Sequence, residues 1–151
     1  MKLETILVPL DFSDVSTLVV EHAGTMAKAF GGRVVLVHIA EPEPDFVGFE
    51  AGPPAVRMST AQEFRGEHRR LEEYKQQLTA AGVEVLALHI QGSLAEKVLE
   101  EAERQSADLI VMGSHGHGAL YNLLVGSVTS GVVKHAKCPV LIVPAQPAIA
   151  A

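Results

Sequence analysis

Three glycines and one serine late in the chain have the types and the spacing of a site for a bound anion. Gly113 ends an apolar run, Gly116 follows after two residues, and nine more residues precede Gly126 and Ser127, which open a helical pattern. Glycine permits positive φ and close approach of the backbone, so successive N–H groups can face one concavity. The start of the helix and the Ser127 hydroxyl add further donors. The spacing therefore predicts a phosphate-binding loop, with plain turn glycines as the alternative.

Two familiar phosphate motifs do not match this segment. A Walker loop requires lysine and then serine or threonine after its last glycine, whereas Gly126 is followed by Ser127 and Val128. A dinucleotide fingerprint follows the first strand, yet residues 9–13 contain no glycine. The sequence also offers no G-x-S-x-G elbow and no identifiable arginine finger or water-orienting base. We therefore expect binding and assign no catalytic residue.

Four other residues carry chemistry of their own. Asp11 follows the first apolar run and is either a pocket carboxylate or a turn residue ahead of a helix. His38 ends an apolar run and is expected to be a hydrogen-bonded core histidine. His115 and His117 stand two apart on the glycine loop, but no third ligand lies near them in the sequence, so we assign no metal site.

The composition limits the class of protein. With 151 residues, 48% of them hydrophobic, the chain is expected to form one domain with a two-sided core. A formal net charge of −6 argues against a nucleic-acid binder, although backbone N–H groups can still hold phosphate. The single cysteine, Cys138, excludes an internal disulfide and is expected to be inert packing. No run approaches the ~18 apolar residues of a membrane span, so we predict a cytoplasmic protein without membrane insertion.

Short apolar runs rich in β-branched residues indicate a parallel sheet covered on both faces. Four nearly continuous runs occupy residues 6–8, 34–39, 109–112 and 140–143. A weaker fifth run, at residues 83–90, contains Glu84 and His89 and is therefore expected nearer an edge.

Helical patterns alternate with these runs. The first opens at Ser13, the expected N-cap, and the second has apolar residues at helical spacing over residues 64–78. The charge-rich stretch 63–75 of that second helix is interpreted as a solvated face. Ser93 and Glu96 have capping-box spacing ahead of the third helix, and the fourth is short. This alternation predicts an α/β fold with right-handed crossovers.

Two segments break the alternation. Residues 41–59 contain four prolines and two glycines, which predicts a loop, either a functional lid or a passive insertion. Residues 145–151 are expected to form a disordered tail. The folded domain is therefore predicted to span residues 1–144.

The glycine spacing and the strands around it resemble a known family. Gly113, Gly116, Gly126 and Ser127 match the G-x2-G-x9-G-(S/T) signature of the universal stress protein family, in its ATP-binding branch. The first, second and last apolar runs are similar to strands of that family. The resemblance covers the chain apart from residues 41–59 and the tail.

The resemblance implies a fold and a ligand. The fold is a single-domain, Rossmann-like α/β structure, with an open five-stranded parallel sheet in the order 3-2-1-4-5 and helices on both faces. The ligand is ATP, or AMP or ADP, with Mg²⁺ or Mn²⁺ carried by the phosphates. Asp11 would lie at the nucleoside end, Ile39 would meet the adenine through its backbone, and Met112 would line the floor. The implied binding residues are Pro9, Asp11, Ile39, Met112, Gly113, Gly116, Gly126, Ser127 and Val128.

The expected function is that of a nucleotide-dependent stress-response or signalling module with at most slow ATP hydrolysis. The resemblance also implies a homodimer that pairs through the last strand, at residues 140–143, and leaves room for an unknown protein partner. Two alternatives stay open. One is an adenylating or ATP-hydrolysing enzyme of related fold, and the other is a regulatory dimer that binds no nucleotide.

Overall fold

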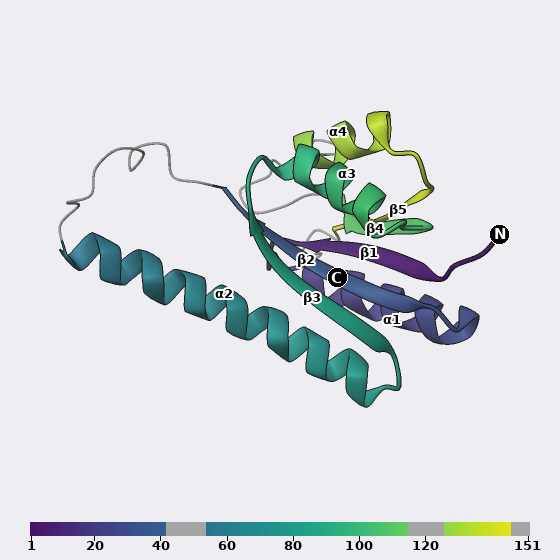
Figure 1. Cartoon of the computed structure of the whole chain (residues 1–151), viewed down its shortest axis with the longest axis horizontal. Helices are drawn as coiled ribbons and strands as arrows, with labels where there is room; N and C mark the ends of the chain where they lie inside the picture. Colours follow the sequence, from purple (N-terminus) through teal and green to yellow (C-terminus); the bar gives the residue numbers. More distant parts are fainter. Residues whose placement is uncertain (42–53, 115–125, 146–151) are drawn as a thin grey trace, which may run out of the picture.

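The computed structural model describes residues 1–41, 54–114 and 126–145, and only the backbone of residues 54–63 (Figure 1). Within these ranges strands and helices alternate along the chain. The elements are β1 (Thr5–Leu10), α1 (Ser16–Phe30), β2 (Arg33–Ala40), α2 (Pro54–Ala80), β3 (Glu84–Gln91), α3 (Leu94–Arg104), β4 (Leu109–Gly113), α4 (Ser127–His135) and β5 (Val140–Val143). None of the helices described is long and apolar enough to cross a membrane.

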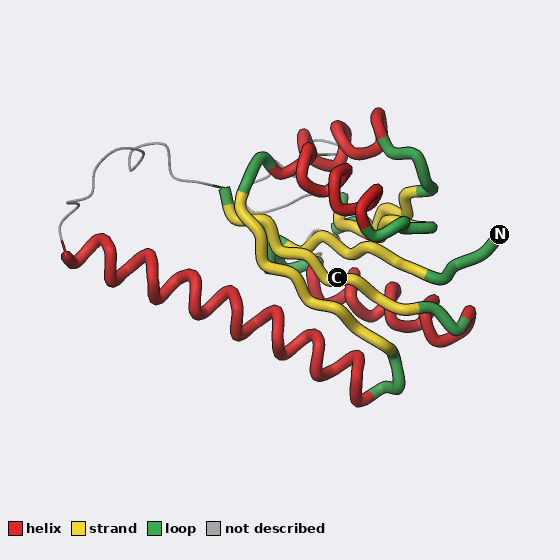
Figure 2. The backbone as a smooth tube through the Cα atoms, viewed as in Figure 1, coloured by secondary structure: helices red, strands yellow, loops and turns green. Residues whose placement is uncertain are grey.

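The strands form one parallel sheet in the order β3-β2-β1-β4-β5. Helices α1 and α2 lie on one side of the sheet and α3 and α4 on the other (Figure 2). Each central strand therefore buries both of its faces, and alternate residues enter different cores. In β1, Ile6 and Val8 belong to the core on the α1 side, whereas Leu7 belongs to the core on the α3 side. The predicted α/β fold and strand order are confirmed.

The apolar pattern of each strand follows from its place in the sheet. β1 and β2 lie inside the sheet, and nearly all of their residues are buried. β3 is an edge strand, as Glu84 and His89 predict, and its residues are more exposed than those of β1 and β2. β5 forms the opposite edge, although its sequence is uncharged.

One predicted N-cap is wrong, and a second has the predicted position without the predicted side-chain bonds. α1 begins at Ser16 with Val15 as N-cap, because Ser13 belongs to the preceding turn: its N–H is bonded to Asp11 and its carbonyl accepts from the Ser16 N–H. Ser93 is the N-cap of α3, but its side chain makes no capping hydrogen bond. The predicted reciprocal bonds with Glu96 are therefore not formed.

The predicted loop at residues 41–59 is too long. α2 begins at Pro54, so residues 54–59 are helical. Proline is favoured at the first helical position, where its missing N–H costs nothing and its fixed φ suits the helix. Residues 42–53 lie outside the described residues, so the choice between lid and insertion is not tested.

The predicted tail begins one residue too early. Ala145 is part of the described structure, and its N–H donates to the Ser114 hydroxyl at 3.0 Å. Residues 146–151 lie outside the described part of the chain.

Candidate functional site

The carboxyl ends of the parallel strands meet at one edge of the sheet. β1 lies between β2 and β4, so the chain crosses to opposite sides of β1 at this point. In open α/β sheets this reversal is where ligands bind. Of the predicted binding residues, Pro9 and Asp11 lie at the end of β1, Ile39 at the end of β2, and Met112 and Gly113 at the end of β4.

The start of α4 is fixed to the end of β4 by one backbone and one side-chain hydrogen bond. The Ser114 N–H donates to the Val143 carbonyl at 2.9 Å, and the Gly126 N–H donates to the Ser114 carbonyl at 2.8 Å. The Thr129 hydroxyl donates to the Gly113 carbonyl at 2.9 Å. Gly126 and Gly113 are therefore brought together although 12 residues separate them. Gly116 lies outside the described residues.

The first turn of α4 offers N–H groups that no helical carbonyl accepts. The first intrahelical bond recorded at this end runs from the Ser130 N–H to the Gly126 carbonyl at 2.9 Å. The N–H groups of Ser127, Val128 and Thr129 precede that bond, and orphan donors of this kind attract anions. The N-cap, Gly126, has no side chain to cap them, and Ser127 is exposed.

Three apolar residues of the predicted site contribute to a single core cluster. Ile39 and Met112 are buried in the core on the α3 side of the sheet, and Val128 packs against that core. These three residues come from β2, β4 and α4. The cluster thus supplies an apolar base beside the polar first turn of α4.

Asp11 shapes the turn that leaves β1. Its Oδ1 accepts the Ser13 N–H at 2.9 Å and the Ser16 hydroxyl at 3.4 Å. The intervening residue, Phe12, has a φ of 60°, a left-handed conformation that is uncommon outside glycine. Asp11 is therefore a turn residue, and it also lies at the carboxyl end of β1, where a ligand would bind. The predicted roles of turn residue and pocket carboxylate do not exclude each other.

Cys138 lies beside Asp108 near the start of β5. Burial, and then the Asp108 carboxylate, raise the pKa of the Cys138 thiol above its usual value. Because the thiolate is the reactive form, this environment agrees with the predicted inert role.

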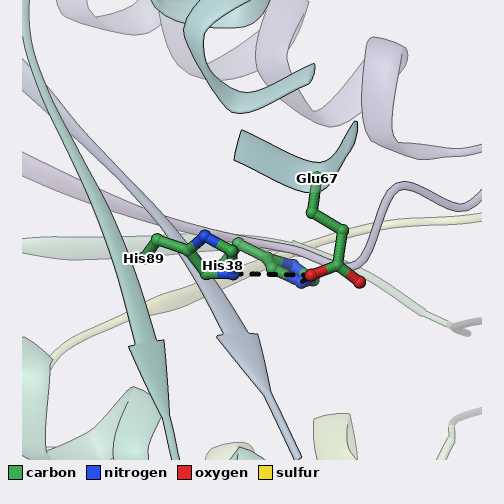
Figure 3. A group of neighbouring side chains, drawn as sticks. All are labelled: His38, Glu67 and His89. Atoms are coloured by element: carbon green, nitrogen blue, oxygen red, sulfur yellow. Dashed lines mark ion pairs between the residues drawn. The ribbon is translucent and has the colours of Figure 1, made fainter. Parts of the chain in front are cut away.

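A second group of polar residues lies on the other face of the sheet, beneath α2 (Figure 3). His38 of β2 and His89 of β3 are direct neighbours in the parallel register. Glu67 of α2 reaches both of them, with Oε2 at 3.2 Å from His38 Nε2 and 3.4 Å from His89 Nε2. His38 is buried and bonded to the Leu10 carbonyl, as expected of a core histidine.

Glu67 is a residue that the sequence interpretation missed. The stretch 63–75 is not uniformly solvated, because Glu67 turns toward the sheet. The position of Glu67 in the sequence could have revealed this orientation. A spacing of alternately three and four residues connects Phe64, Glu67, Leu71, Tyr74 and Leu78. That spacing places Glu67 on the apolar stripe of the helix.

Comparison with known proteins identifies the family. The sequence model of the universal stress protein family matches residues 2–144. The chain belongs to this family. Universal stress protein MJ0531 of Methanocaldococcus jannaschii is 36% identical over 138 residues, which are 91% of this chain and 80% of that protein.

Solved structures of universal stress proteins share the fold. The structure of MJ0577, also from Methanocaldococcus jannaschii, has a TM-score of 0.84 at 27% identity and covers 98% of this chain and 100% of that chain. A universal stress protein solved in complex with cAMP has a TM-score of 0.70 at 25% identity, with 95% of this chain and 98% of that chain covered.

Proposed function

We propose that this universal stress protein binds ATP, or ADP or AMP, at the carboxyl edge of its sheet. The observation that carries the proposal is the contact between α4 and β4. Hydrogen bonds from Gly126 and Thr129 hold the orphan N–H groups of α4 beside the end of β4, next to the reversal of strand order at β1. An anionic phosphate bound there would receive backbone hydrogen bonds without any lysine or arginine.

The nucleoside would lie toward β1 and β2. Ile39 would meet the adenine through its backbone, Met112 would line the floor, and Asp11 would accept a hydrogen bond from the ribose. Pro9 and Val128 would complete the pocket, and Gly113, Gly116, Gly126 and Ser127 would surround the ribose and phosphates. Mg²⁺ or Mn²⁺ would be carried by the phosphates. The relative solved with cAMP supports an adenine nucleotide as the ligand class.

The biological role we propose is signalling by nucleotide occupancy, with at most slow hydrolysis. Backbone donors bind ground-state phosphate, but hydrolysis also needs a group that orients water or stabilises the transition state. The protein would act in the cytoplasm as a homodimer that pairs through β5, with a protein partner of unknown identity.

The direct test is to denature the purified protein and identify the released small molecules by mass spectrometry. We expect adenine nucleotide, and a rise in melting temperature when ATP is added to nucleotide-free protein. Protein that carries no nucleotide and shows no ATP-dependent stabilisation would support the non-binding regulatory dimer. Release of pyrophosphate with an acceptor substrate would support the adenylating enzyme instead.

The location of the phosphate is tested separately by Gly126→Val and Gly116→Val. A branched side chain would block the approach of phosphate to the backbone N–H groups, so ATP affinity should fall while the fold is retained. Calorimetric titration with ATP measures the affinity, and far-UV circular dichroism measures the fold. Wild-type affinity in both variants would mean that the phosphates bind elsewhere.

A further inference from the structure

The residues His38, Glu67 and His89, here called the histidine–glutamate cluster, form a set of potential metal ligands apart from the proposed nucleotide site. One ligand atom from each residue lies within 4.8 Å of the other two. The three residues come from β2, α2 and β3, on the α1 and α2 side of the sheet (Figure 3). The apolar residues of the proposed nucleotide site belong to the core on the opposite side.

Hydrogen bonding fixes which nitrogen of His38 faces the cluster. His38 Nδ1 lies 2.7 Å from the Leu10 carbonyl oxygen, which can only accept, so Nδ1 carries a proton. In the neutral ring, Nε2 then has a lone pair and points to the Glu67 carboxylate. Metal-binding histidines are commonly oriented in this way, with the second nitrogen donating to a carbonyl.

Three of the four imidazole nitrogens of the cluster have no aligned hydrogen bond within the described residues. His38 Nε2 and both nitrogens of His89 are buried without such a partner, although Glu67 is within reach of both rings. Buried polar atoms without an aligned partner destabilise the fold. A cation placed between the nitrogens and the carboxylate would satisfy both rings at once.

Two of the three ligand-atom separations in the cluster suit a small tetrahedral ion. Ligand atoms about 2.0–2.1 Å from a tetrahedral Zn²⁺ are separated from one another by about 3.3–3.4 Å. The two nitrogen–oxygen distances, 3.2 Å and 3.4 Å, match this separation. Two imidazoles and one carboxylate leave a fourth position for water, as in many zinc sites with three protein ligands.

Aromatic rings flank the cluster. The ring of Phe12 lies 4.5 Å from that of His38, and the ring of Phe64 stacks on His89 at 4.3 Å. The histidine side chains are only 8% and 7% exposed, whereas that of Glu67 is 35% exposed. An ion would therefore enter from the Glu67 side and be held by ligands on neighbouring strands.

We propose that the histidine–glutamate cluster binds one Zn²⁺ ion, through His38 Nε2, His89 Nε2 and a Glu67 carboxylate oxygen. The Leu10 carbonyl, which accepts from Nδ1, orients the His38 ring. The sequence did not indicate this site because its ligands are spread from residue 38 to residue 89 and meet only through the β2–β3 register and the packing of α2.

The test is a zinc titration of the chelator-treated, full-length protein against a competing chromophoric chelator. We compare wild type with Glu67→Gln and His89→Gln, which keep the approximate shape of each side chain. Each variant should bind Zn²⁺ at this site at least about 100-fold more weakly. His68→Ala is the matched control, because His68 is an exposed residue of α2 whose ring lies 6.4 Å from that of His89 without belonging to the cluster.

Co²⁺ provides a second readout, since tetrahedral Co²⁺ has intense visible absorption bands. These bands should be present in wild type and His68→Ala and absent from Glu67→Gln. The Glu67→Gln variant should keep the fold, because the Glu67 side chain is partly exposed on the surface of α2. Wild-type zinc affinity in both Glu67→Gln and His89→Gln would overturn the proposal, as would an equal loss in His68→Ala. The titration contains no nucleotide, so its failure would leave the proposed ATP site unaffected.

Discussion

Asp11 combines a conformational role with its proposed role in the nucleotide pocket. Its Oδ1 accepts from Ser13 and Ser16 and so defines the turn between β1 and α1. Phe12 within that turn has a φ of 60°, which costs about 1–2 kcal/mol for a residue with a Cβ. The packing of Phe12 against His38 and the bonds of Asp11 together offset this cost.

Replacing Asp11 should therefore affect both stability and binding. We expect Asp11→Ala to lower the free energy of unfolding by about 1 kcal/mol, because the turn N–H loses its acceptor. ATP affinity should fall by about tenfold if the carboxylate accepts a ribose hydroxyl. Asp11→Asn keeps an oxygen acceptor and should retain most of the stability. Urea unfolding measures the stability, and calorimetry measures the ATP affinity. Full stability of Asp11→Ala would contradict the role in the turn. Unchanged ATP affinity would contradict the role in the pocket.

Cys138 should be slow to react with alkylating reagents. Its pKa is raised, so the thiolate fraction at pH 8 is smaller than that of an ordinary cysteine and grows only at higher pH. Iodoacetamide labelling, followed by mass spectrometry, should be slower for the folded protein than for protein unfolded in urea, and the difference should narrow as the pH rises. Equal rates at pH 8 would show that burial does not protect the thiol.

At the scale of elements, replacement by alanine should have opposite effects on stability at two glycines. A Cβ at Gly32 would overlap the Leu3 carbonyl oxygen, where the chain turns from α1 into β2. Gly66 lies within α2, and a Cβ there meets nothing within 4 Å.

We therefore expect Gly32→Ala to destabilise the protein by about 1–3 kcal/mol, because backbone must move. Gly66→Ala should stabilise it by about 0.5–1 kcal/mol, because alanine is the better helix former. Urea unfolding of both variants beside wild type measures the difference. A destabilised Gly66→Ala would indicate that this turn of α2 makes closer contacts than the structure has.

The elements themselves were largely predictable from sequence, because two-sided burial produces continuous apolar runs that mark the strands. The order of strands was available only through the family resemblance. Helix ends were predicted less well. Ser13 has the residue type of an N-cap, but Asp11 engages its backbone N–H first, and the helix starts three residues later.

The candidate sites differ in how far sequence reveals them. The glycine loop is contiguous, so its spacing is readable, and the structure brings Gly113 close to Gly126. The histidine–glutamate cluster is not contiguous. His38 and His89 become neighbours only through an exact strand register, and periodicity alone does not define register.

At the scale of the whole molecule, the two edges of the sheet differ in which of the described residues cover them. β3 packs against α2, which runs alongside it, as Figure 1 shows. β5 is short and uncharged, and Leu141 on it is 36% exposed. An apolar edge strand with unpaired backbone groups is a template for pairing with a second chain. This contrast favours β5 as the proposed dimer contact.

Charge on the β5 edge should therefore separate the subunits. We expect wild type to sediment as a dimer and Leu141→Lys as a monomer, because pairing of β5 across a twofold axis would bury two lysines together. Leu86→Lys on β3 is the matched control, since Leu86 is 37% exposed on the opposite edge strand, and it should remain dimeric. Sedimentation velocity over a range of concentrations distinguishes the outcomes. A dimer that survives Leu141→Lys but is lost in Leu86→Lys would indicate that the contact lies at β3. A monomeric wild type would exclude a stable dimer.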